Sequence, residues 1–314
     1  MLTQKNVLSL CILALAGCGV PVWGSGVSAE RRLHLDPVRA LELQGNIDAR
    51  VTPGEAGTAT LRCDDNLIDH IRAEVDEGEL DLRFSPGVMG IPATRCALEL
   101  HEPGLRRIEV SGSADFVAAG PLPALHEVEV SGSGSVTVGR DGWSVGTAEE
   151  EEPAEEGAED SGGLLSGGED GGLVEEPAPA EEEEADSAAL LSDWSARLPD
   201  PADELFVEVS GSGEVFVGGV DASLVDVEIS GSGEVGLRGA SHELVAEVSG
   251  SGEVAARPLS AARLDAEVSG SGGVRATATA RAHVEISGSG EVDVWGDPDQ
   301  RSKDVSGSGE VHWR

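Results

Sequence analysis

Apolar and polar residues alternate along most of this chain, which is the pattern of β-strands with one buried face. In the stretch 207–219, VEVSGSGEVFVGG, valines alternate with acids on both sides of a Ser-Gly-Ser-Gly tetrad. Strand parity places the valines and both glycines on one side, and Glu208, Ser210, Ser212 and Glu214 on the other. No stretch keeps a helical period, so the pattern predicts an all-β protein.

The tetrad, with close versions of it, occurs eight times. The copies begin at Ser111, Ser131, Ser210, Ser230, Ser249, Ser269, Ser287 and Ser306, at intervals of 20, 79, 20, 19, 20, 18 and 19 residues. A near-constant period of this length favours a β-solenoid whose coils are about 20 residues long. The first coils are expected in residues 111–140 and the others in 198–314. A sandwich in which the tetrads form hairpin turns is the alternative.

The region before the first tetrad, residues 35–110, is predicted to consist of short strands. It alternates in the same way, with Gly, Pro and Asp turns between the apolar runs. Only the stretch 64–71, DDNLIDHI, has a helical character, over one or two turns at most.

The interval of 79 residues contains an acidic insertion, residues 141–197. From 148 to 193 there are 18 acids and no base, with Gly and Pro scattered among them. Such a segment buries too little apolar surface to offset its ordering entropy, so we expect it to be disordered.

Stacked coils would place identical residues in columns. One acidic column would consist of Glu109, Glu129, Glu208, Glu228, Glu247, Glu267, Glu285 and Asp304. A second would consist of Glu214, Glu234, Glu253, Glu291 and Glu310, with Gly273 as a gap and Asp115 and Ser135 in its first two places. The favoured interpretation is a solvated, charged face that prevents edge aggregation. Capture of divalent cations by the carboxylates of the second column is the alternative, since oxygen ligands suit Ca²⁺.

The N-terminus has the features of an export signal. Lys5 precedes the short apolar run VLSLCILALA, so residues 1–17 are expected to be a signal peptide. The run ends in LAGC, which resembles the lipobox of bacterial lipoproteins, and this resemblance implies a lipid on Cys18 and a tether over 18–34. A plain secretory signal is the alternative. The lipid would place the protein in the cell envelope, and Gly19 favours the outer membrane.

Two cysteines, Cys63 and Cys96, lie beyond the signal and the lipobox. An even count in an oxidising compartment favours a disulfide between them over a free or metal-binding pair.

Composition excludes some functions. The net charge is −38, from 59 acids and 21 bases, so a nucleic-acid partner is not expected. The match GSGEVG at 231–236 has no helix after it to bind a phosphate. We found no catalytic motif, and a Glu repeated in every coil is a ladder rather than one tuned pair, so no enzyme and no cofactor are expected.

The ordered combination LELQGNIDARVTPG, CDDNLIDHIRAEVDEGELDLRF and recurring EVSGSGEV resembles the auto-transporter adhesin head GIN domain family. The similarity runs from about Leu35 to the C-terminus, without the acidic insertion. It implies a right-handed β-helix with a β-rich N-terminal portion, in the cell envelope, frequently with a lipoprotein signal. The chain lacks the membrane-anchoring β segment of a trimeric autotransporter, so the lipid on Cys18 would anchor it.

The sequence therefore predicts a lipid-anchored, non-enzymatic adhesion or binding scaffold that works through its repeated Ser/Glu face. Its partner would be a polysaccharide or a surface protein, and homo-oligomers stay open. An envelope enzyme acting on glycans and a cation-responsive structural protein are the alternatives.

Overall fold

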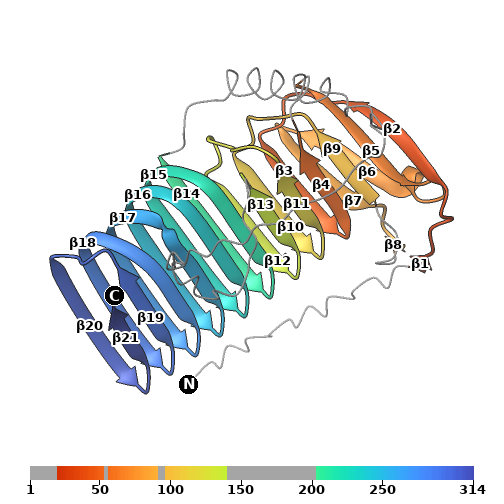
Figure 1. Cartoon of the computed structure of the whole chain (residues 1–314). Coiled ribbons are helices and arrows are strands. Elements are labelled where there is room, and N and C mark those ends of the chain that lie inside the picture. Colours follow the sequence, from red (N-terminus) through yellow and green to blue (C-terminus); the bar gives the residue numbers. More distant parts are fainter. Residues whose placement is uncertain (1–19, 53–55, 91–95, 140–202) are drawn as a thin grey trace, which may run out of the picture.

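The computed structural model describes residues 20–52, 56–90, 96–139 and 203–314. They form a β-solenoid in which parallel layers stack along one axis (Figure 1). The predicted all-β solenoid is confirmed. The predicted signal peptide, Cys18 and the acidic insertion lie outside the described residues.

The strands fall into three groups. The N-terminal strands are β1 Val20–Val22, β2 Ser28–His34, β3 Ala40–Gly45, β4 Ile47–Val51, β5 Thr58–Asp64, β6 Ile71–Asp76, β7 Glu79–Phe84, β8 Val88–Gly90 and β9 Cys96–Leu100. The layers before the insertion contain β10 Arg107–Gly112, β11 Asp115–Ala118, β12 Glu127–Gly132 and β13 Ser135–Val138. The layers after it contain β14 Glu204–Gly211, β15 Glu214–Gly231, β16 Glu234–Gly250, β17 Glu253–Gly270, β18 Gly273–Gly288, β19 Glu291–Trp295, β20 Gln300–Gly307 and β21 Glu310–Trp313.

The eight tetrads lie directly over one another. The first serine of each tetrad pairs with the first serine of the next one, in the order 111, 131, 210, 230, 249, 269, 287 and 306. Every one of these pairings is parallel, whereas strands joined by hairpin turns would pair antiparallel. The stacked arrangement therefore holds, and the sandwich alternative is wrong.

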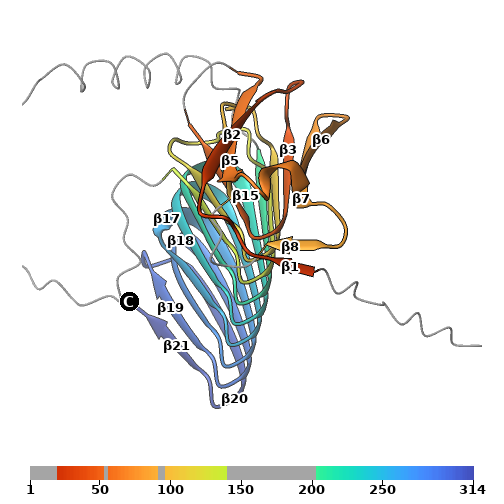
Figure 2. The ribbon, with the colours of Figure 1, turned by 90° about the vertical axis from the view of Figure 1, so that its right-hand side faces the viewer.

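Each layer is a V in cross-section, with the tetrad at its narrow corner (Figure 2). We call the strand before a tetrad the leading arm and the strand after it the trailing arm. At the opposite, wide end the ladder shifts register, for example between Gly218 and Val220 and between Ala256 and Ser260. Differences in repeat length are thus absorbed at the wide end, whereas the narrow corner stays constant.

The core is a column of apolar side chains between the two arms. Val130, Val209 and Ile229 occupy one inward position in successive layers, and each is fully buried. Alternation along each strand directs the next residue outward, as Glu208 does between two buried valines. The hydrophobic effect on these inward residues holds the layers together in addition to the backbone ladder.

The stack begins before the first tetrad. β3 pairs in parallel with β10, aligning Glu42 with Glu109 and Gly45 with Gly112, and β4 pairs with β11. On their other side, β3 and β4 pair in parallel with β7 and β9. Part of the stretch 35–110 is therefore solenoid, and its β3–β4 layer lies between layers that come later in the chain.

Antiparallel strands cover the N-terminal end of the stack. β2 pairs with β5, β5 with β9, and β6 with β7. Residues 28–34, which the sequence analysis assigned to the tether, form β2, and residues 20–22 form β1, which pairs with β8. Ala29 and Leu33 alternate along β2 and pack against the core, which explains why this segment joins the fold.

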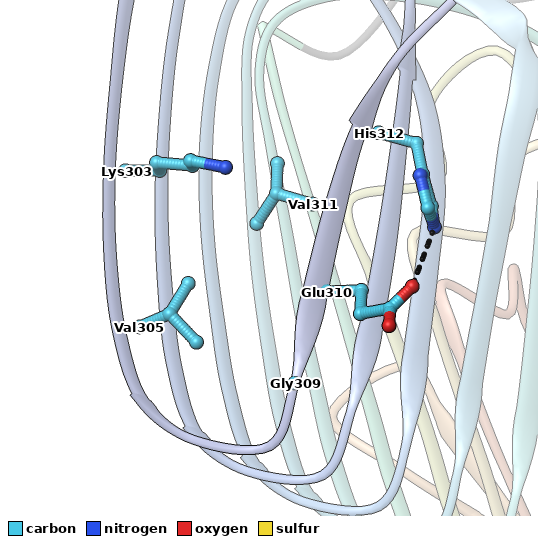
Figure 3. A pocket seen from close by; sticks show the side chains of 6 residues that line it. All are labelled: Lys303, Val305, Gly309, Glu310, Val311 and His312. Carbon is cyan, nitrogen blue, oxygen red and sulfur yellow. Dashed lines mark ion pairs between the residues drawn. The ribbon is translucent and has the colours of Figure 1, made fainter.

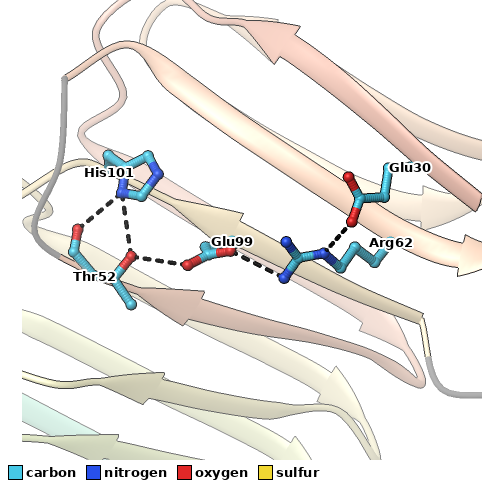
Figure 4. Close-up of polar contacts among 5 residues, drawn as sticks. All are labelled: Glu30, Thr52, Arg62, Glu99 and His101. Atoms are coloured by element: carbon cyan, nitrogen blue, oxygen red, sulfur yellow. Dashed lines mark hydrogen bonds and ion pairs between the residues drawn. The ribbon is translucent and has the colours of Figure 1, made fainter. Parts of the chain in front are cut away.

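Polar contacts connect β2, β5 and β9 (Figure 4). Arg62 Nε lies 2.8 Å from Glu30 Oε1, and Arg62 Nη1 lies 3.3 Å from Glu99 Oε2. Thr52 Oγ1 donates to Glu99 Oε1 at 3.3 Å, and His101 Nδ1 lies 3.2 Å from Thr52 Oγ1. Exposed pairs of this kind contribute little to stability. We therefore assign them to the cap and not to a functional site.

Cys63 on β5 and Cys96 on β9 form a disulfide in this cap, with Cα atoms 4.3 Å apart. The one-turn 3-10 helix η1, Ile68–His70, lies within the stretch for which the sequence indicated one or two helical turns. In the described part of the chain, no helix has both the length and the apolarity that crossing a bilayer requires.

Candidate binding surface

The glycines of the tetrads allow the layers to stack tightly at the narrow corner. Gly211 has φ +127°, and a Cβ there would lie 2.5 Å from the carbonyl oxygen of Gly132 in the preceding layer. A Cβ at Gly213 would lie 2.8 Å from the carbonyl oxygen of Gly134. Glycine is required at Gly211 because other residues rarely adopt this φ, and at both positions because a Cβ would collide with the preceding layer. The tetrad serines, such as Ser210 and Ser212, remain exposed and form a ridge along the corner, which we call the serine ridge.

An acidic column runs along the leading arms beside this ridge, as predicted. Successive members are direct partners in the parallel ladder, and they are Glu109, Glu129, Glu208, Glu228, Glu247, Glu267, Glu285 and Asp304. The structure adds Glu42 and Asp81 at its N-terminal end. We call these ten residues the first acidic column. Glu42 could have been predicted from the sequence, because LELQG alternates apolar and polar residues in the same order as VEVSG.

Among the described residues, basic side chains pair only with members near the two ends of the first acidic column. Arg107 Nη2 lies 2.8 Å from Glu109 Oε2 and 3.9 Å from Glu129 Oε2. At the other end, His283 Nε2 lies 3.1 Å from Glu285 Oε1. Among the described residues, the four members between them, Glu208, Glu228, Glu247 and Glu267, form no ion pair. This run of carboxylates is thus available to a cationic partner.

Partial burial and repulsion raise the pKa values of carboxyls in this column. Loss of hydration, followed by repulsion from Glu129 and Glu228, raises the pKa of Glu208. Loss of hydration also raises the pKa of Glu247, with Glu267 and Glu228 as the next causes. Carboxyls on neighbouring strands, which lie about 4.8 Å apart, therefore oppose one another's ionisation.

A second acidic column runs along the trailing arms on the other side of the serine ridge. It contains Asp115, Ser135, Glu214, Glu234, Glu253, Gly273, Glu291 and Glu310, paired in this order as predicted. Loss of hydration raises the pKa of Glu234, with Glu253 and Glu214 adding repulsion. Gly273 leaves a hollow of about 240 Å³, lined by Glu253, Arg275 and serines of three successive tetrads.

Three potential metal ligands meet near the end of the second column. One ligand atom each of Glu291, Asp293 and His312 lies within 4.8 Å of the others. His312 Nε2 is 3.2 Å from Glu291 Oε1, and Asp293 Oδ1 is 2.9 Å from Arg314 Nε. Asp293 is only 8% exposed, which is unusual for a carboxylate. Of the five second-column carboxylates considered as cation ligands, which are Glu214, Glu234, Glu253, Glu291 and Glu310, only Glu291 belongs to this cluster. Asp293 and His312 were not predicted, because they become neighbours only through the register between layers.

The last layer differs from the others at its inward positions (Figure 3). Lys303 pairs with the buried Val284 and takes its inward position. The ammonium points into a hollow of about 370 Å³ that is also lined by Val305 and Val311. An inward charge on an edge strand disfavours pairing with another strand. This end of the described solenoid is thus chemically unlike its interior.

Comparisons with known proteins agree with this architecture. The model of the family described as "Putative auto-transporter adhesin, head GIN domain" matches residues 38–146 and 187–298. Among proteins of curated function, none matches the sequence.

Solved structures of similar fold include three proteins from Parabacteroides. They include a "Putative lipid binding protein" (TM-score 0.66, 18% identity) and a "putative adhesin" (TM-score 0.65, 18% identity), both from Parabacteroides distasonis, and each comparison covers 94% of this chain and 100% of the other. A "putative adhesin" from Parabacteroides merdae has a TM-score of 0.64 and 16% identity over 94% of this chain and 99% of its own. Identities this low show a shared fold.

Proposed function

Because the chain belongs to the auto-transporter adhesin head GIN domain family, we propose that it is a lipid-anchored, non-enzymatic binding scaffold of the bacterial cell envelope. The family supports a binding or adhesion role at the cell surface. The anchor would be a lipid on Cys18, and the outer membrane is the proposed site. The contact surface would be the serine ridge with the two acidic columns beside it.

The in-register stacking of the acidic columns is the observation that carries this proposal. It presents carboxylates and hydroxyls at a constant spacing of about 4.8 Å over many layers. In the first acidic column the central carboxylates have no positive partner among the described residues. Weak contacts that recur along one ligand reinforce one another through effective concentration. A linear polysaccharide with amino and hydroxyl groups fits such a surface, and a surface protein with spaced basic side chains is the second class of partner.

A glycan array probed with the mature protein tests this function. We expect amine-bearing polymers to be retained at low ionic strength and released by salt, because exposed charges are screened. The matched comparison is a variant with Glu208→Gln, Glu228→Gln and Glu247→Gln, which should lose most of the retention. Equal retention of this variant would contradict a role for the first acidic column.

Single Glu→Gln variants along the first acidic column separate a scaffold from a glycan-acting enzyme. If binding works by repetition, each single Glu→Gln change weakens it slightly. An enzyme would instead lose turnover of a retained glycan at one or two positions while the other changes had no effect.

The anchor is tested independently of the ligand. Cells expressing the wild type and Cys18→Ala are labelled with a palmitate analogue, and only the wild type should incorporate the label and stay with the membrane fraction. Equal labelling of the two proteins would overturn the proposed lipidation site.

A cation-responsive role is the second candidate, and the cluster of Glu291, Asp293 and His312 favours it. Carboxylates together with an imidazole suit Zn²⁺ or Mn²⁺ better than Ca²⁺. If this role is correct, Zn²⁺ raises the melting temperature more than an ionic-strength-matched Na⁺ control, and His312→Ala removes the difference. Equal shifts would exclude it.

A further inference from the structure

Two arginines face each other on the leading arms near the C-terminal end. Arg263 on β17 and Arg281 on β18 are direct partners in the parallel ladder. Each lies six positions before its tetrad serine, on the outward side of the sheet, and both are exposed. The ladder fixes their backbones about 4.8 Å apart. The fold thus places two arginines side by side on one face of the sheet.

These arginines line a hollow of about 530 Å³. Its lining residues belong to β16, β17, β18 and β20, whose order along the stack can be followed in Figure 1. Gln300 and Ser302 line it from the next layer. The amide and hydroxyl groups of these residues offer neutral hydrogen-bond donors beside the guanidinium groups. The hollow therefore places neutral polar groups beside the two arginines. A third arginine in its lining, Arg301, pairs with Asp297.

Neither guanidinium forms an ion pair within the described part of the chain, although Glu243 and Asp265 lie beside Arg263. Arg281 Nε donates to Gln300 Oε1 at 3.0 Å, and no ion pair is formed by Arg263 or Arg281. In a protein with 59 acids and 21 bases, two neighbouring arginines that form no ion pair are unexpected. The two charges are available to an anion from solution.

Acidic groups limit where that anion can lie. Glu243 precedes Arg263 in the ladder, and Asp265 lies two residues beyond Arg263, so both lie on the same face. His283, opposite Asp265, bonds with Ser302 Oγ at 2.7 Å and Glu285 Oε1 at 3.1 Å. An anion is therefore favoured on the side of Arg281 and Gln300, away from Glu243.

We propose that the hollow between Arg263 and Arg281 binds the phosphate group of a ligand. A planar guanidinium donates two parallel hydrogen bonds to a phosphate, and a phosphate dianion has enough acceptor oxygens for two such forks. Its charge also relieves the repulsion between the arginines. A small phosphomonoester and the phosphomonoester head group of phosphatidate present the same chemistry.

This site is independent of the proposed function. It selects an anion, whereas the acidic columns select cationic or hydroxyl-bearing polymers, and it lies toward the wide end of the leading arms. Either binding activity can fail without affecting the other.

The test compares the wild type with the double variant Arg263→Gln/Arg281→Gln. The matched control is Arg50→Gln/Arg238→Gln, which removes two exposed arginines elsewhere and makes the same change in net charge. Binding of glycerol 3-phosphate is measured by titration calorimetry at low ionic strength. Binding to phosphatidylcholine vesicles with and without phosphatidate is measured by flotation. Circular dichroism verifies that all three proteins are folded.

We expect the double variant to bind at least about tenfold more weakly than the wild type, because two charge-assisted contacts are lost, and the control to bind within about twofold of it. Arginine-dependent binding of glycerol 3-phosphate identifies a soluble ligand, and arginine-dependent binding only to phosphatidate vesicles identifies a lipid. The proposal is overturned if the wild type binds neither probe, or if the double variant binds as well as the control.

Discussion

Gly231 and Gly250 lie opposite each other in neighbouring layers, and a Cβ on Gly250 would overlap the carbonyl oxygen of Gly231. Gly250 also has φ +130°, a conformation that L-residues with side chains rarely adopt. Gly250→Ala should therefore destabilise the solenoid by about 3 kcal/mol or more, as measured by denaturant unfolding.

The matched control is Ser251→Ala, at the next, exposed residue of the same tetrad. It should change the free energy of unfolding by less than about 0.5 kcal/mol. If Gly250→Ala were as stable as this control, the tight stacking at the narrow corner would be wrong.

The carboxyls of the first acidic column make stability depend on pH. The folded-state pKa values of Glu208 and Glu247 are raised by loss of hydration and by neighbouring carboxyls. A raised pKa means that the folded state binds protons more readily than the unfolded chain does. The stability from these groups is present below their unfolded pKa, about 4.3, and is lost as pH rises through the folded pKa. We expect a melting temperature that falls between about pH 4 and pH 7.

Glu247→Gln removes one charge from the column and should raise the melting temperature at pH 7 by about 1–2 °C. Asp221→Asn, an exposed acid outside both columns, is the charge-matched control. A melting temperature that rises steadily from pH 4 to pH 7 in the wild type would show that repulsion in the column is negligible.

Lys303 should limit association through the C-terminal end of the solenoid. Its ammonium occupies an inward position where the layer beneath has the buried Val284. Lys303→Val would extend the apolar wall of Val305 and Val311, and we expect it to raise the self-association constant by about tenfold in sedimentation velocity. Lys303→Arg keeps the charge and should behave like the wild type. Equal sedimentation of all three proteins would refute this role.

The disulfide should stabilise the N-terminal cap. Cys63 and Cys96 are 33 residues apart and both are buried. Cys63→Ala/Cys96→Ala should lower the free energy of unfolding by about 3–4 kcal/mol, because the unfolded chain regains the entropy of an open loop. A thermal melt of the double variant measures the loss, and an unchanged melting temperature would contradict it.

Much of the solenoid could be predicted from sequence because its signals are local. Parity within VEVSGSGEV assigns each residue to the inside or the outside, and the constant period aligns equivalent residues. Both acidic columns follow from these two facts. The layer formed by β3 and β4 was missed because Gln44-Gly45-Asn46 replaces the tetrad at its corner. This layer lies between strands that come later in the chain, and the alternation of apolar and polar residues does not indicate which strands pair.

The other surface groups could not be predicted for a different reason. Asp293 and His312 are 19 residues apart, and Arg263 and Arg281 are 18 apart, so they meet only once the register between layers is known. Counting six residues back from the tetrad serines aligns the two arginines, and counting six residues forward aligns Asp293 with His312. Their ion-pair partners, or the absence of partners in the described residues, depend on side-chain geometry that no periodicity encodes.

Binding of chito-oligosaccharides of increasing length to the mature protein tests the central claim most directly. These amine-bearing sugars serve as the probe, and calorimetry at low ionic strength gives the dissociation constant for each length. If the stacked carboxylates act by repetition, affinity rises with each added sugar and Glu→Gln changes along the first acidic column reduce this rise step by step. An affinity that no longer changes beyond the dimer, or that one substitution abolishes, would contradict the account.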